Sequence, residues 1–263
     1  MRDTGVRATR AANMRSLLGG ILMGLAILAG GCVTETTGRH QQASDVDRVQ
    51  AQLDLARGYL EESEYGRARR PLNRALEIDP QHVESYVLLA VLNEREGEIE
   101  LAEQSYLSAL RYDSGDAQAL NNYGSFLYGQ GRFEEAVVQL RKLVGNPDYR
   151  ARAQAYENLG IAELQIGERE RARVAFNRSL SLNYAQPRSS LELASLSFED
   201  GDYAAAQEYY DGFRSHARQN SRSLCLGVKL GRVLGNANQV ASFDLALKNL
   251  FPDSDEAKDC QAP

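Results

Sequence analysis

Residues 119–144 read ALNNYGSFLYGQGRFEEAVVQLRKLV, and the fold of the chain can be predicted outward from them. Two small residues, Gly124 and Ala136, lie on either side of Gly131, and the bulky Leu140 follows Ala136 by about one helical turn. A glycine between two segments of helical periodicity is typical of a turn between helices. Small side chains let two helices cross closely, and a bulky one fills the space beside the crossing. The segment therefore predicts two antiparallel helices.

The same pattern recurs along most of the chain. One small position is held by Ala56, Ala90, Gly124, Gly160, Ala194 and Gly227. A second is held by Ala68, Ala102, Ala136, Ala172 and Ala206, and a bulky position by Leu72, Tyr106, Leu140, Phe176, Tyr210 and Phe243. Successive members of the first and third series are 34, 34, 36, 34 and 33 residues apart. A period near 34 matches the tetratricopeptide repeat, so we predict an all-α superhelix of helix-turn-helix repeats.

The series divide residues 49–253 into about six units. We place the units at 49–82, 83–116, 117–152, 153–186, 187–219 and 220–253. Glycines that can adopt positive φ mark the turns inside four of them: Gly97, Gly131, Gly167 and Gly201. Pro80 and Pro252 are expected to follow the ends of second helices, because proline cannot continue a helix. We expect residues 254–263 to form a short tail or cap.

The first 31 residues have the layout of a bacterial secretory signal. Four arginines precede an apolar run over residues 17–29, and Gly30 and Gly31 stand directly before Cys32. The run is too short to span a bilayer comfortably, so we predict cleavage of residues 1–31 and lipidation of Cys32. An uncleaved anchor and a plain signal peptide remain alternatives. Met14 offers a second start that would give a leader of ordinary length.

The residues after Cys32 bear on localisation. Val33 stands where an aspartate commonly retains lipoproteins in the inner membrane. In a Gram-negative bacterium we therefore expect an outer-membrane lipoprotein whose body faces the periplasm. Residues 32–48 are mostly polar and without periodicity, and we predict a flexible, lipidated tether.

Charge and motif content argue against several functions. The leader contains four arginines and one aspartate, so its removal changes the net charge from −6 to −9. An acidic body disfavours nucleic acid, and membrane attachment must then come from the lipid. The three histidines are scattered, and no metal, phosphate-binding or nucleophile motif is present in the sequence. We predict neither an enzyme nor a cofactor, metal or small-molecule substrate.

Two cysteines, Cys225 and Cys260, remain after lipidation of Cys32. An oxidising compartment would permit a disulfide that pins the tail to the last unit. The alternative is a buried, reduced Cys225 with Cys260 free in the tail. Spacing alone does not choose between them.

A short sequence motif points to a more specific family of repeat proteins. Residues 119–128, ALNNYGSFLY, resemble the LNNYGxFL signature of the type IV pilus biogenesis and stability lipoproteins, the PilF/PilW family. Residues 70–80, 156–160 and 220–227 agree with this resemblance, which covers essentially the whole chain after the leader. It implies a pilotin that helps the pilus secretin subunit reach the outer membrane and form its multimeric ring; some members stabilise the fibre. The alternative is a tetratricopeptide adaptor for other envelope assembly, such as cell-wall enzymes or outer-membrane protein insertion.

Tetratricopeptide proteins generally bind polypeptides in the groove lined by their first helices. In this register the inward candidates of the middle units are Asn121, Ser125, Tyr128, Glu157, Ile161 and Leu164. Asn121 can hydrogen-bond a peptide backbone, and Tyr128 combines apolar area with a polar tip. The alternative is that Asn121 satisfies backbone groups between units and Tyr128 packs inside.

Overall fold

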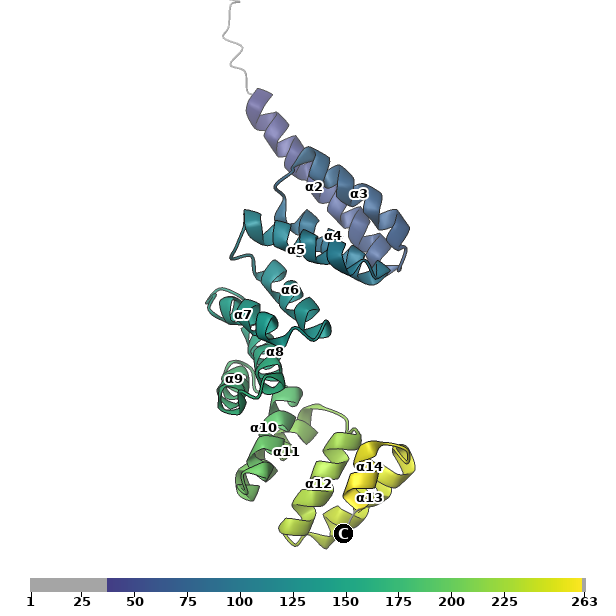
Figure 1. The fold of residues 1–263 in the computed structure, drawn as a ribbon, viewed down its shortest axis with the longest axis vertical. Helices are drawn as coiled ribbons and strands as arrows, with labels where there is room; N and C mark the ends of the chain where they lie inside the picture. Colours follow the sequence, from purple (N-terminus) through teal and green to yellow (C-terminus); the bar gives the residue numbers. More distant parts are fainter. Residues whose placement is uncertain (1–36, 262–263) are drawn as a thin grey trace, which may run out of the picture. The chain divides into compact units, whose positions relative to one another are not determined.

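The computed structural model describes residues 37–261, with side chains from residue 44 to residue 260, and this part contains helices and no strand. Figure 1 shows consecutive helices arranged as pairs. The first four pairs are α2 (Thr37–Glu61) with α3 (Tyr65–Ile78), α4 (Val83–Glu96) with α5 (Ile99–Tyr112), α6 (Ala117–Gly129) with α7 (Phe133–Val144), and α8 (Arg152–Gln165) with α9 (Arg169–Leu182). They are followed by α10 (Pro187–Glu199) with α11 (Tyr203–His216), α12 (Ser221–Val233) with α13 (Ala237–Leu250), and a last helix, α14 (Asp255–Gln261).

Local sequence sets the helix ends. The Asp116 carboxylate accepts a hydrogen bond from the Ala119 N–H at 2.7 Å and caps α6. The four predicted turn glycines all have positive φ, between 74° and 81°, and Gly235 takes the same role in the last pair. In the first pair this place is held by Ser63, with φ of 59°, which the glycine pattern missed. The helices α3 and α13 end two residues before Pro80 and Pro252, as expected.

The repeating small and bulky positions form the core. The alanines after the turns are fully buried in all five units that carry them, and so are Leu72, Phe176 and Tyr210. A Cβ at Gly160 would lie 2.7 Å from the Phe176 ring, so glycine is needed for that crossing. Packing is looser at the last bulky position, because Phe243 is only partly buried. The all-α repeat prediction is confirmed.

Two segments outside the repeat series are helical. The sequence predicts a flexible tether over residues 32–48, but α2 already begins at Thr37. Residues 254–263 were expected as a tail or cap, and α14 occupies most of them, packed against α12 and α13. Both segments lack the repeat periodicity, so their helical state was not visible in the three series. The helix α8 also begins one residue before the predicted boundary at 153.

The chain divides into a compact unit of residues 48–263, which contains the helix pairs from Arg48 onward, and a preceding unit that ends at Asp47. The predicted leader and Cys32 lie outside the described residues. Within the described part, none of the helices combines the length and apolar character that a bilayer crossing requires.

Candidate functional site

Three of the six predicted groove residues come together in one pocket. This middle pocket, of about 180 Å³, is lined by Gly124, Ser125, Tyr128, Leu140, Asn158, Ile161 and Arg188. Its walls come mainly from the first helices α6, α8 and α10. The floor is apolar, whereas Ser125 and Arg188 are exposed. The pocket suits a single aliphatic side chain of a bound polypeptide.

The structure does not place the other three groove candidates in this pocket. Leu164 packs against the core cluster of Ile161 and Phe176. The Asn121 side-chain N–H donates a hydrogen bond to the side-chain Oδ1 of Asn122 at 3.3 Å. Glu157 is only 5% exposed and is hydrogen-bonded by Ser189 of the next unit. This corrects its assignment as an accessible groove residue. One-residue errors in helix rotation suffice to exchange a surface position for a core position.

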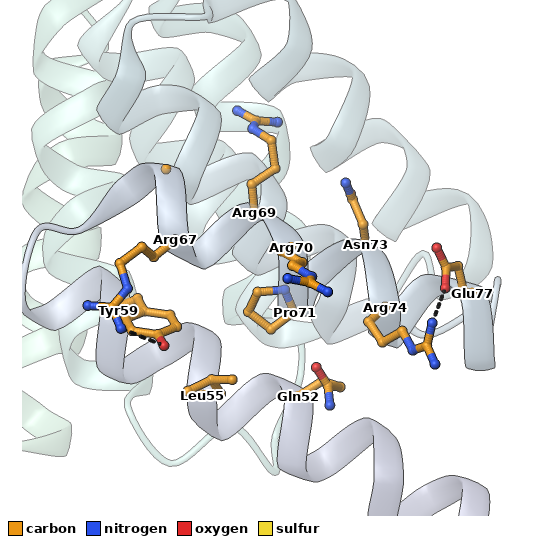
Figure 2. Close-up of a pocket in the computed structure, with 11 residues that line it drawn as sticks. Gln52, Leu55, Tyr59, Arg67, Arg69, Arg70, Pro71, Asn73, Arg74 and Glu77 are labelled. Carbon is orange, nitrogen blue, oxygen red and sulfur yellow. Dashed lines mark hydrogen bonds and ion pairs between the residues drawn. The ribbon is translucent and has the colours of Figure 1, made fainter.

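A larger recess, which we name the first-unit recess, lies between α2 and α3 and was not predicted (Figure 2). It has a volume of about 1000 Å³ and is lined by Gln52, Leu55, Tyr59, Gly66, Arg67, Arg69, Arg70, Pro71, Asn73, Arg74 and Glu77. Leu55 is 47% exposed, so the recess offers apolar surface as well as charge. The arginines at 67, 70 and 74 form a helical stripe that could have signalled the recess, but such stripes are usually solvated faces.

The arginines of this recess differ in the ion pairs and hydrogen bonds that they make within the protein. The Arg67 guanidinium lies 4.3 Å from the centre of the Tyr59 ring and pairs with Glu64, which raises the pKa of Arg67. Arg69 turns away toward Glu96 and Asn93 of α4. Arg74 pairs with Glu77 at 3.2 Å. Arg70 is exposed and makes no ion pair with a described residue.

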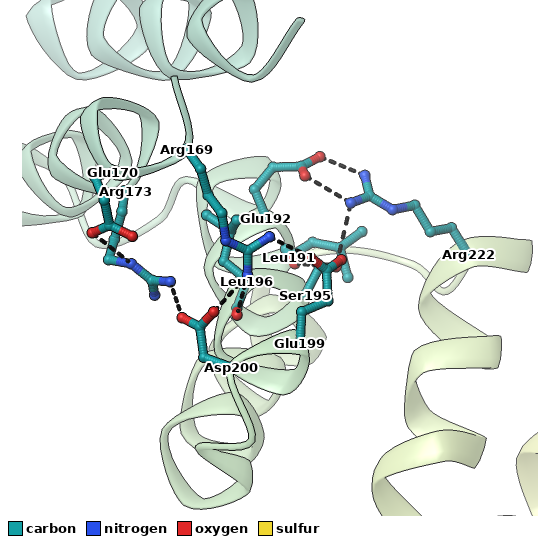
Figure 3. A network of polar contacts seen from close by, with 10 residues as sticks. All are labelled: Arg169, Glu170, Arg173, Leu191, Glu192, Ser195, Leu196, Glu199, Asp200 and Arg222. Atoms are coloured by element: carbon teal, nitrogen blue, oxygen red, sulfur yellow. Dashed lines mark hydrogen bonds and ion pairs between the residues drawn. The ribbon is translucent and has the colours of Figure 1, made fainter. Parts of the chain in front are cut away.

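Ion pairs also join the fourth, fifth and sixth units (Figure 3). The Asp200 carboxylate accepts from Arg169 at 2.8 Å and from Arg173, and the Arg169 hydrogen bond holds the pKa of Asp200 below its ordinary value. Arg222 of α12 donates two hydrogen bonds to Glu192 of α10, at 2.5 and 2.7 Å, and this carboxylate raises the Arg222 pKa. These contacts restrain the units against one another.

The described side chains do not form a recognisable reaction centre. His82 caps α4, since its Nδ1 accepts from the Ser85 N–H, and His216 Nδ1 contacts the Gly212 carbonyl. Between residues 37 and 261 no group of three histidine, cysteine, aspartate or glutamate side chains is arranged to hold a metal ion. The prominent features are recesses that can receive a polypeptide.

Comparison with known proteins agrees with this architecture. The tetratricopeptide-repeat family model matches residues 53–117, 97–157 and 157–220. The type IV pilus assembly protein PilF of Pseudomonas aeruginosa is 39% identical over 241 residues, which cover 90% of this chain and 95% of the relative.

Solved structures give the same result. The structure of Pseudomonas aeruginosa PilF superposes with a TM-score of 0.79 and covers 83% of this chain and 98% of that one. PilW, described as a widely conserved type IV pilus biogenesis factor, is 26% identical with a TM-score of 0.68, covering 81% of this chain and 98% of its own. The chain therefore belongs to the PilF/PilW family of tetratricopeptide-repeat proteins of type IV pilus biogenesis.

Proposed function

We propose that this protein is a pilotin, an outer-membrane lipoprotein that binds the type IV pilus secretin subunit and promotes its localisation and multimerisation. The observation that carries the proposal is the 39% identity to a pilus assembly protein over 90% of the chain. A stack of helix pairs with open recesses suits a scaffold that holds another polypeptide. The role requires no catalysis.

The proposed anchor is the lipid on Cys32. Only four residues lie between Cys32 and the start of α2 at Thr37, so the two are at most about 18 Å apart along the chain. A lipid on Cys32 would thus keep the start of α2 close to the periplasmic face of the outer membrane. Multiple acyl chains give stable attachment without a membrane-spanning helix.

The proposed contact with the secretin is the first-unit recess, with the middle pocket as a second contact. The recess is the larger of the two, and it exposes Leu55 beside the rings of Tyr59 and Pro71. Exposed apolar area inside a concave surface is typical of protein-binding sites.

A deletion strain complemented with variants tests the function. We expect deletion to abolish secretin multimers in outer-membrane fractions and to stop twitching. Cys32→Ala should leave the protein mislocalised and without fatty-acid label. Leu55→Glu should reduce secretin multimers, whereas Leu107→Glu, at a leucine that is 48% exposed on α5, serves as the matched control.

The outcomes separate the two functional classes. Normal secretin multimers and twitching in the deletion strain would contradict the pilotin role. If that strain instead shows defects in cell-wall synthesis or outer-membrane protein insertion, the protein is an adaptor for other envelope assembly.

A further inference from the structure

The first-unit recess has two chemically different walls. The α2 wall is neutral and consists of Gln52, Leu55 and Tyr59. The α3 wall is mainly cationic, because Arg67, Arg70 and Arg74 line it together with a single acidic residue, Glu77. On each helix the spacings are three and four residues, so each set forms one stripe about 10 Å long. Figure 2 shows the two stripes facing each other across the recess.

The cationic wall contrasts with the rest of the chain. Residues 65–78 contain four arginines and one glutamate, a net charge of +3, whereas the whole chain carries −6. Local positive potential on an acidic protein favours an anionic partner at this place.

Two of the arginines are available to such a partner. Arg70 is exposed and has no ion pair with a described residue. The pair between Arg74 and Glu77 is 3.2 Å long, and both side chains are more than 60% exposed. Exposed pairs of this kind contribute at most about 1 kcal/mol, so Arg74 can exchange Glu77 for an incoming carboxylate at little cost.

We propose that the first-unit recess binds an acidic amphipathic helix. Its apolar side chains cover Leu55 and Tyr59, and its carboxylates meet Arg70 and Arg74. The inference rests on the proposed function, because this helix would belong to the secretin subunit. An amphipathic helix lying in a groove between two helices is a common mode of peptide recognition.

The geometry favours a helix over a lipid surface. Carboxylates at positions i and i+4 of a helix are about 6 Å apart, which matches the separation of Arg70 and Arg74 along α3. Leu55 is 47% exposed and lies between the two helices beside the buried Pro71, where a protein side chain can reach it. The headgroups of a flat membrane would meet the arginines and leave this apolar floor uncovered.

The probe is a fluorescent helical peptide of about four turns that carries leucines and glutamates on adjacent stripes. A matched peptide has lysine in place of each glutamate. Binding to the purified full chain is followed by fluorescence anisotropy at ionic strengths of about 50 and about 500 mM. The variant R70Q/R74Q removes the two available charges. R178Q/R218Q removes the same charge from exposed positions elsewhere and is the control.

We expect the glutamate peptide to bind, high salt to weaken it, and R70Q/R74Q to weaken it about tenfold at low salt, with the control variant unchanged. Circular dichroism verifies that both variants are folded. Equal binding of the lysine peptide, or equal binding to R70Q/R74Q, would overturn the inference. Arg70-dependent binding to phosphatidylglycerol vesicles without binding of the glutamate peptide would overturn it as well.

Capture of the secretin separates this inference from the proposed function. If R70Q/R74Q captures the secretin as well as the wild type does, the acidic-helix inference fails and the pilotin role stands. If the wild type itself does not capture the secretin, the proposed function fails, and the peptide titration still decides the chemistry of the recess.

Discussion

The Glu157 carboxylate accepts two hydrogen bonds from Ser189, one from its backbone N–H and one from its hydroxyl, both at 2.9 Å. Glu157 is in α8 of the fourth unit and Ser189 is in the first turn of α10 in the fifth. The carboxylate therefore binds the start of one unit to the previous one. A buried acidic side chain in this place has a structural role, although its repeat position made it a candidate for partner binding.

Glu157→Ala should lower the free energy of unfolding by about 1–3 kcal/mol, because it leaves the buried Ser189 N–H without its acceptor. Urea denaturation followed by circular dichroism measures the change. Glu134→Ala, at an exposed position of α7, should change stability by less than about 0.5 kcal/mol. Equal effects of the two substitutions would contradict the structural role of Glu157.

The disulfide between Cys225 and Cys260 joins α12 to α14, with Cα atoms 5.7 Å apart. Replacing both cysteines by alanine should destabilise the last unit by about 3–4 kcal/mol, given the loop that the bond closes. Because terminal repeats fray independently, we expect hydrogen exchange to accelerate in α13 and α14 while α6 and α7 stay protected. Reduction of the wild type should reproduce this local pattern; uniform protection after reduction would exclude a clamping role.

Buried tyrosines predict a loss of stability in alkali. Burial raises the pKa of Tyr210 to about 12 and also raises the pKa values of Tyr106 and Tyr123. Since an unfolded tyrosine ionises near pH 10, the unfolded state loses protons first, and the free energy of unfolding falls as the pH rises from about 10 to 12. The contribution of Tyr210 is present in full below pH 10 and amounts to about 2–3 kcal/mol.

Denaturant midpoints measured across that pH range test the prediction. Tyr210→Phe should flatten the alkaline slope. Tyr184→Phe should leave it unchanged, because Tyr184 is 77% exposed. A slope that does not respond to Tyr210→Phe would exclude this tyrosine as its source.

Where a glycine lies at a close helix crossing, adding a single methyl group should lower the stability of the protein. Gly160→Ala places a carbon 2.7 Å from Phe176, so we expect a loss of about 1–3 kcal/mol by overpacking. Gly58→Ala has no atom within 4 Å of the new carbon and should be neutral or slightly stabilising. Thermal unfolding of the two variants compares them directly, and a stabilised Gly160→Ala protein would show that the crossing is looser than described.

The middle pocket can be closed without disturbing the core. Ser125 is exposed at its rim, so Ser125→Phe should fill it and weaken secretin capture about tenfold while helicity is kept. Asn121→Ala, just outside the pocket, should leave capture unchanged. If Ser125→Phe captures secretin normally, the second contact does not exist and binding is confined to the first-unit recess.

The periodic part of the fold was predictable residue by residue. Ala136, Gly160 and Phe176 recur in register because every unit must pack against its neighbours in the same way, so the constraint is local and repeats along the chain. The turn glycines follow from backbone geometry, which depends on the residue itself. The family could also be identified from the sequence, because the resemblance at residues 119–128 is carried by contiguous residues.

Tertiary packing decided the rest. Cys225 and Cys260 meet only because α14 folds back onto α12, and α14 lacks the repeat pattern. Glu157 is buried and Ser125 is exposed, although both lie on first helices at predicted inward positions, because the next unit covers Glu157. The recess beside Leu55 depends on how α2 lies against α3. Periodicity specifies which face of a helix is buried to within about one residue, and the crossing of neighbouring helices then determines which of those side chains a partner can reach.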